Sequence, residues 1–114
     1  MSGSVPEEAL VVLTVSPAIE EAVIDWLLAR REGSGFTSMP VSGHSARQQG
    51  LSNLEQVTGR QRRVQFQMEM RGQEVDAFLE NARATFGGAD IHFWVVPVLS
   101  AGRLGHKTAA PSGR

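Results

Sequence analysis

Apolar residues recur along this chain with two different spacings, and each change of spacing marks a new element. Residues 9–15, ALVVLTV, are apolar on both faces, which predicts a short central strand. From Val64 to Arg71 apolar and polar residues alternate, which predicts a strand with one face toward water. Spacings of three and four over 17–30 and 75–86 predict two amphipathic helices, the first capped by Ser16.

Two further strands complete the pattern. GFTSMPVSG, residues 35–43, contains Pro40, which has no N–H for a ladder and therefore places this strand at a sheet edge. IHFWVVPVL, residues 91–99, predicts the last strand. The order βαββαβ predicts a ferredoxin-like α+β fold. We expect a four-stranded antiparallel sheet with both helices on one face and the first and third strands in the centre.

The fourth strand is apolar on both of its faces, although this topology leaves it at an edge. Phe93 and Val95 lie on one face, and Trp94 and Val96 lie on the other. A single helix layer covers only one face, so the other needs a covering surface. We expect a second copy of the chain there; a tail that folds back over the strand is the alternative.

Composition narrows the class of protein. The chain has 114 residues, which is the size of one domain, and its net charge of −1 predicts no general nucleic-acid footprint. It has no cysteine, which excludes disulfides and thiolate metal sites. No apolar run has the length of a membrane helix, and MSGSVPEEAL does not have the pattern of a secretory signal. We therefore expect a cytoplasmic protein with no direct membrane insertion, and a flexible tail from about residue 104.

One stretch is unusually long and basic. Residues 43–63, GHSARQQGLSNLEQVTGRQRR, carry four arginines and one acid between the second and third strands. Connections in compact domains usually run to about 4–6 residues. Ser52 to Glu55 fit a capping box, which predicts a short helix through Val57. Because guanidinium groups bind phosphate and carboxylate with paired hydrogen bonds, an anion-binding loop is one interpretation. A solvated hairpin tip is the other.

Other candidate chemistry is sparse. Gly87-Gly88 offers either backbone N–H groups to a phosphate or a helix C-cap, and the residues alone favour the cap. The histidines do not have a metal-ligand spacing on one helix. We expect His92 to be packed and hydrogen-bonded, with metal binding by His44 and His92 across a subunit interface as the alternative. No nucleophile, base and acid are placed by spacing, so we expect no enzyme.

The second strand and the start of the basic stretch resemble PII signalling proteins. Their G-M-T-x-x-x-V-x-G-F-G-R-Q-x-G pattern is matched, with one extra residue before the arginine, by Gly35, Thr37, Val41, Gly43, Arg47, Gln48 and Gly50. GADIHFWVVPV is similar to the PII stretch that begins its fourth strand. A closer resemblance is to the small PII-like proteins of the DUF3240 family, whose GF, GHS, LS, EQV, GRQ and IHFWVVPV pattern covers about residues 9–99.

The resemblance to PII implies a trimer with adenine nucleotides in the clefts between subunits. In that family the T-loop, here about 44–62, meets a target protein that is often a transporter or an enzyme. Members of the DUF3240 group tend to be associated with heavy-metal efflux genes. This chain departs from PII in having His92 near the position of a lysine and a shortened B-loop at 87–90. It has no tyrosine, which excludes tyrosine modification of the loop.

The sequence therefore predicts a non-enzymatic, PII-like regulatory trimer that binds a small anion. An adenine nucleotide is one candidate for the ligand, and no obligatory cofactor is expected. The predicted ligand-binding residues are Gly43, Arg47, Gln48, Arg60, Arg62, Gly87 and Gly88, and the 44–62 loop would act on a partner such as a membrane transporter or efflux component. One alternative is a metal-responsive protein linked to heavy-metal efflux or tolerance. Another is an interaction adaptor with no small ligand.

Overall fold

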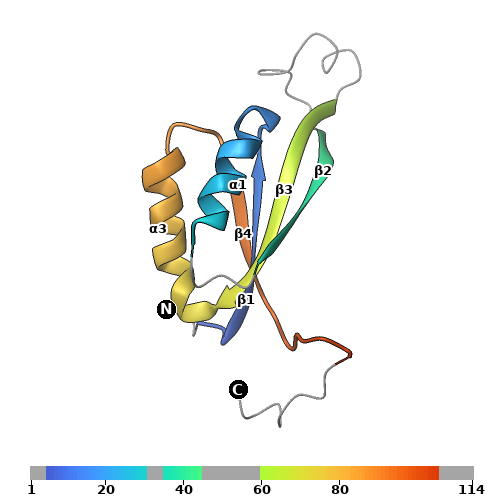
Figure 1. The fold of residues 1–114 in the computed structure, drawn as a ribbon, viewed down its shortest axis with the longest axis vertical. Coiled ribbons are helices and arrows are strands. Elements are labelled where there is room, and N and C mark those ends of the chain that lie inside the picture. Colours follow the sequence, from blue (N-terminus) through green and yellow to red (C-terminus); the bar gives the residue numbers. More distant parts are fainter. Residues whose placement is uncertain (1–4, 31–34, 45–59, 106–114) are drawn as a thin grey trace.

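The fold is a four-stranded antiparallel sheet with two helices packed on one of its faces (Figure 1). The computed structural model describes residues 5–30, 35–44 and 60–105. The strands, in the spatial order β2-β3-β1-β4, are β1 Glu8–Val15, β2 Phe36–His44, β3 Arg60–Arg71 and β4 His92–Pro97. The helices are α1 Glu20–Leu28 and α3 Val75–Phe86, which follow the 3₁₀ turns η1 Pro17–Ile19 and η2 Gly72–Glu74. The predicted ferredoxin-like arrangement is confirmed, with β1 and β3 in the centre.

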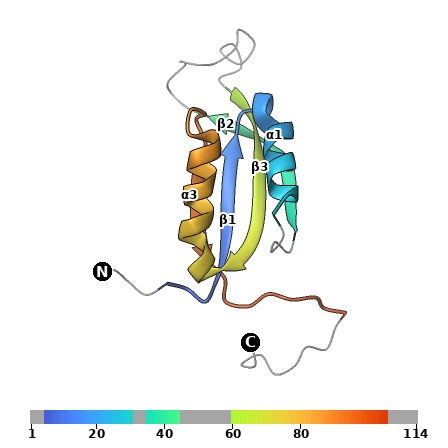
Figure 2. The same cartoon turned by 60° about the vertical axis from the view of Figure 1, so that its left-hand side comes forward.

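The core lies between the helices and one face of the sheet (Figure 2). Because side chains alternate along a strand, the odd-numbered residues of β1 and the even-numbered residues of β3 face the helices together. The buried core consists of Ala9, Val11, Leu13, Val15, Val23, Leu27, Val64, Phe66, Met68, Val75 and Phe78. Neither α1 nor α3 covers the opposite face of the sheet (Figure 2).

An aromatic cluster joins the two helices. The ring of Trp26 on α1 lies 5.3 Å from that of Phe78 and 5.5 Å from that of Phe86, both on α3. The guanidinium of Arg30 lies 4.5 Å from the centroid of the Phe78 ring, which is 1% exposed. Ring pairs and cation–π contacts of this geometry add to the burial of apolar area. The cluster therefore fixes how α1 and α3 pack side by side.

Most of the predictions about where helices and strands begin, end or lie at an edge are confirmed. Ser16 caps the first helical segment, since its Oγ accepts a hydrogen bond from the N–H of Ala18 at 3.2 Å. β2, which contains Pro40, lies at one edge of the sheet, and β4 lies at the other. β4 ends at Pro97, two residues before the predicted end, although the N–H of Val98 still donates to the carbonyl of Glu8 at 3.0 Å.

β3 begins earlier than the sequence pattern predicts. It starts at Arg60, opposite His44, and the ladder continues with Gln61 opposite Gly43. No apolar alternation marks this end, because residues 60–63 are all polar and pair with β2 through the backbone. The loop between β2 and β3 is thereby reduced to residues 45–59. Residues 45–59 lie outside the described residues. They include Arg47, Gln48 and the helix predicted at 52–57.

Gly72 packs directly against the chain before β1. It is buried, its N–H donates to the carbonyl of Glu7 at 2.9 Å, and a Cβ on it would overlap the carbonyl oxygen of Pro6. We expect Gly72→Ala to lower the free energy of unfolding by about 1–3 kcal/mol, because the backbone must shift to admit the methyl group. Urea unfolding measures this. Gly88→Ala, where a Cβ meets nothing within 4 Å, is the matched control. Equal losses in both variants would contradict the prediction.

Candidate functional site

The paired ends of β2 and β3 form a basic end of the molecule. Gly43 and His44 close β2, and Arg60, Arg62 and Arg63 open β3 beside them. Arg60 and Arg62 are exposed, whereas Arg63 is half-buried. The structure therefore brings together three of the predicted ligand-binding residues, Gly43, Arg60 and Arg62. The ladder holds them in a fixed register, so the guanidinium groups emerge from a strand rather than from a loop.

The turn between α3 and β4 lies at the same end of the molecule (Figure 1). Nη2 of Arg63 lies 3.7 Å from Oδ2 of Asp90, and the Asp90 side chain is 82% exposed. An ion pair this exposed contributes about 0–1 kcal/mol to stability, so its main consequence is positional. It links the end of β3 to the Gly87–Asp90 turn, which the sequence predicted as the shortened B-loop.

Gly87 and Gly88 lie in the turn that ends α3. Gly87 is the C-cap of α3, and the N–H of Ala89 donates to the carbonyl of Phe86 at 2.9 Å. A Cβ on Gly87 would lie 2.6 Å from the carbonyl oxygen of Arg83, so the helix end requires a glycine there. The C-terminus of a helix carries partial negative charge. The positive charge that the described residues place at this end therefore comes from side chains, those of the β3 arginines and of Arg83 in the last turn of α3.

His44 and His92 lie on opposite edges of the sheet. β3 and β1 separate their strands, and three strand spacings amount to about 14 Å. One chain therefore does not place both imidazoles on one metal ion. His92 is exposed and stands opposite Thr14 on β1, so the packed position predicted for it is wrong. Within the described ranges, no group of three or more His, Asp and Glu side chains is placed to hold a metal ion.

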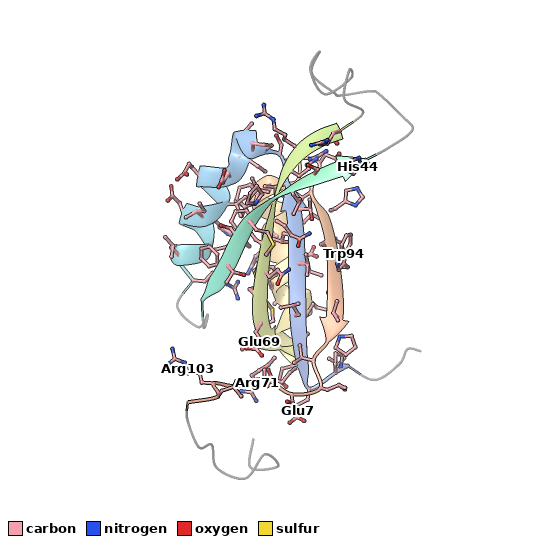
Figure 3. All side chains as sticks on the ribbon, turned by 90° about the vertical axis from the view of Figure 1, so that its right-hand side faces the viewer. Glu7, His44, Glu69, Arg71, Trp94 and Arg103 are labelled. Carbon is pink, nitrogen blue, oxygen red and sulfur yellow. The ribbon has the colours of Figure 1, made fainter. Side chains whose placement is uncertain are left out.

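The face of the sheet opposite α1 and α3, which we call the open face, carries an apolar half on β4 and β1 and a polar half that includes β3. Figure 3 shows Trp94 on β4. On the apolar half, Trp94 is 52% exposed and Val96 is 40% exposed. Val12 is 4% exposed although no helix covers it, because it stands between Trp94 and Gln67 in the ladder. The exposed aromatic ring is the feature expected of a surface that contacts another protein.

A row of polar side chains continues the open face over β3 and β1. Nε2 of Gln67 donates to Oε1 of Gln65 at 3.1 Å, and Nε2 of Gln65 lies 3.4 Å from Oγ1 of Thr14. The alternation of glutamines along 64–71 was visible in the sequence, but the row was missed because its third member lies on another strand.

A cavity that the sequence did not predict, with a volume of about 470 Å³, lies at the opposite end of the sheet, near Arg30 and Phe36.

These features define a small ferredoxin-like α+β domain with a basic end and an uncovered sheet face. The sequence model of the family described as "Protein of unknown function (DUF3240)" matches residues 5–105, and the chain belongs to this family. Among solved structures it is similar to a DUF3240 family protein from Shewanella baltica OS155, with 21% identity over 91% of this chain and 99% of that one and a TM-score of 0.71. That likeness supports the fold. A search of the curated proteins finds no match.

One further structural finding concerns membranes. Among the described residues, neither α1 nor α3 has the length and apolar composition needed to cross a bilayer.

Proposed function

We propose that this chain is a non-enzymatic regulatory protein of the PII-like type, which binds a small anion at its basic end. The observation that supports this most directly is the convergence of Gly43, Arg60 and Arg62 with the turn that holds Asp90. Two segments that are far apart in the sequence, the ends of the β2–β3 connection and the α3–β4 turn, meet there. In PII-like proteins, which this chain resembles, the T-loop base and the B-loop help to hold the nucleotide.

The chemistry of this end suits a phosphate or carboxylate. Arg60 and Arg62 are exposed, so a ligand can approach their planar guanidinium groups. Asp90 pairs with Arg63, and the stretch 43–63 carries four arginines and one acid. A local excess of positive charge on a chain with a net charge of −1 favours a small anion over a long polyanion. The resemblance to PII makes an adenine nucleotide the first candidate.

The open face supports the self-association that this proposal includes. An exposed tryptophan and valine on β4 adjoin the buried Val12, so the apolar half continues across two strands. A second copy that covers this half would remove it from water. The resemblance to PII sets the number of copies at three. Ligands would then bind in the clefts between copies, and the ends of the 44–62 loop would lie beside them.

Regulation would follow from the position of the arginines at the base of the loop. A ligand that binds Arg60 and Arg62 favours the loop conformations compatible with its own binding, and so shifts their populations. A partner that recognises one of those conformations, such as a membrane transporter, would then respond to the ligand. No step of this scheme requires a chemical reaction.

Calorimetry with ATP, ADP, AMP and cyclic AMP tests the ligand site. At about 100 µM protein, an affinity near 1 mM, or about −4 kcal/mol, marks the weakest binding of interest. We expect Arg60→Ala and Arg62→Ala each to weaken binding by about tenfold or more, because each removes a charged donor. Arg71→Ala is the matched control, since Arg71 is an exposed arginine at the opposite end of β3. Absence of heat with all four nucleotides would remove the nucleotide proposal, and an equal loss in the control would remove the site.

The same calorimetric experiment distinguishes the metal-responsive alternative from the anion-binding proposal. Zinc, copper or cobalt ions replace the nucleotides in the calorimeter. Binding that is abolished by His44→Ala and is unaffected by Arg62→Ala would favour that alternative over the anion site.

A further inference from the structure

The chain continues past β4 as an extended segment, residues 98–105, which we call the C-terminal arm. After the hydrogen bond from Val98 to Glu8 it has no regular secondary structure. In Figure 1 it leaves the lower end of β4 and runs out from the body on the side away from α3. Leu99 is 99% exposed and Leu104 is 106% exposed, so the chain's own domain covers neither side chain. Two fully exposed leucines on one short segment indicate a surface that binds elsewhere.

A cavity lies at the same end of the molecule, and we call it the lower pocket. Its volume is about 470 Å³, within the range of about 300–1,000 Å³ that is typical of binding pockets. It forms where α1 ends, where β2 begins and where β3 ends. Its apolar lining consists of Leu27, Leu28, Phe36, Met68 and Met70. Leu28 is 69% exposed there, so part of the apolar lining faces water.

Charged side chains surround this apolar lining without pairing among themselves. Three carboxylates line the pocket, those of Glu8, Glu69 and Glu74. Across the described ranges, none of the three lies within ion-pair distance of an arginine or lysine side chain. Arg30 and Arg71 also line the pocket, but the guanidinium of Arg30 lies against the ring of Phe78 at 4.5 Å. Arg71 reaches Glu74 through its backbone N–H, which donates to Oε1 at 3.3 Å. The pocket thus combines an apolar lining with carboxylates that have no cationic partner.

The arm carries the complementary groups. Its sequence from residue 99 is LSAGRLG, so Arg103 directly precedes Leu104. We propose that the C-terminal arm of one copy docks in the lower pocket of a neighbouring copy, with Leu104 on the apolar lining and Arg103 toward Glu8 and Glu69. This rests on the self-association in the proposed function. The arm adds to it a second contact at the end of the molecule opposite the anion site.

The geometry favours exchange between copies over docking within one chain. The arm starts from β4 and passes beneath the sheet to the side of β2, where the lower pocket opens (Figures 2 and 3). The arm runs outward, and its leucines do not pack on the chain's own pocket. Arm and pocket lie at the same end of the long dimension. Cyclic symmetry about an axis along that dimension would keep every arm level with a neighbour's pocket.

Disulfide cross-linking tests this arrangement directly, because the chain has no cysteine and each variant carries a single thiol. Leu28→Cys and Leu104→Cys chains, given tags of different size, are co-expressed, purified and oxidised. We expect a disulfide between the two different chains, with a yield about fivefold or more above that of Leu104→Cys with Glu80→Cys, because only docking brings the Cβ atoms to about 4 Å. Glu80 is an exposed residue on α3, outside the pocket lining.

A charge reversal gives a second measurement. Glu69→Lys in the Leu28→Cys chain should lower the yield severalfold, since it opposes Arg103. Asp76→Lys, the same change on an exposed position of α3, should leave the yield unchanged. Equal yields with Leu28→Cys and Glu80→Cys would overturn the proposal. A chain that carries both Leu28→Cys and Leu104→Cys would also overturn the proposal if its disulfide formed only within one chain.

Light scattering on the unmodified chain shows which proposal has failed. An oligomer that gives no cross-link leaves self-association standing and removes the arm exchange. A monomer at micromolar concentration removes both.

Discussion

Phe78→Ala is expected to lower the free energy of unfolding by about 3–5 kcal/mol, the largest single effect on stability that we expect from this core. The Phe78 side chain is 1% exposed, and its ring contacts both Trp26 and the guanidinium of Arg30. Truncation therefore leaves a cavity between the helices and also removes a ring–ring and a cation–π contact. Urea unfolding followed by circular dichroism measures the change.

Phe93→Ala is the matched control for this substitution. Phe93 is also on the helix side of the sheet, but it is 46% exposed at the edge strand. Its truncation should cost about 1–2 kcal/mol, because roughly half of its apolar area is already in water. Losses of equal size in the two variants would show that the aromatic cluster does not carry the packing of α1 on α3.

Trp94→Asp is expected to weaken self-association by about 100-fold or more, or about 2.7 kcal/mol. The Trp94 side chain lies on the open face beside Val12 and is 52% exposed in the isolated chain. A carboxylate at this position would have to lose its water in any interface formed there, without a partner to replace it. The fold of the single chain should be retained, since half of the ring is in water already. Light scattering across a concentration series measures the association.

Trp94→Phe provides the conservative control, because it keeps an apolar ring on the same face. It should retain most of the association. If Trp94→Asp keeps the mass of the unmodified oligomer at micromolar concentration, the open face is not the interface, and self-association must use another surface.

The two ends of the sheet have different chemistry, and this separates the proposed ligand from the proposed arm contact. The basic end collects arginines from one strand, and its neighbour Asp90 pairs with Arg63. The lower end has an apolar pocket lined by three carboxylates and two arginines, with no ion pair between them among the described residues. Substitutions at one end should therefore leave the measurement made at the other unchanged, so the two proposals can be tested independently.

Much of the fold could be predicted from the sequence because its signals are local. The period of apolar residues identified all four strands and both helices, and Ser16 and Pro40 gave a helix start and a sheet edge. The start of β3 could not be predicted in this way. Arg60 to Arg63 form a strand because β2 supplies the hydrogen-bonding partner, and that partner lies beyond a connection of fifteen residues at 45–59.

The candidate site also has a part that could be predicted from the sequence and a part that could not. The basic composition of the stretch drew attention to Arg60 and Arg62, and the resemblance to PII added Gly43; the ladder places the three together. Nothing local predicts that Asp90 would reach Arg63, or that Glu8 and Phe36 would line one pocket. These groups come from different elements, and no spacing along the chain relates them.

By itself, the sequence determined the order of the elements and which side chains of each one face the core, because hydrophobic period and chain-breaking residues act within a few positions. The tertiary structure decided which elements became neighbours. The strand order β2-β3-β1-β4 separated His44 from His92, and the tertiary structure brought the start of β3 to the α3–β4 turn. That order depends on packing between residues that are distant in sequence, and such contacts leave no local pattern to be recognised.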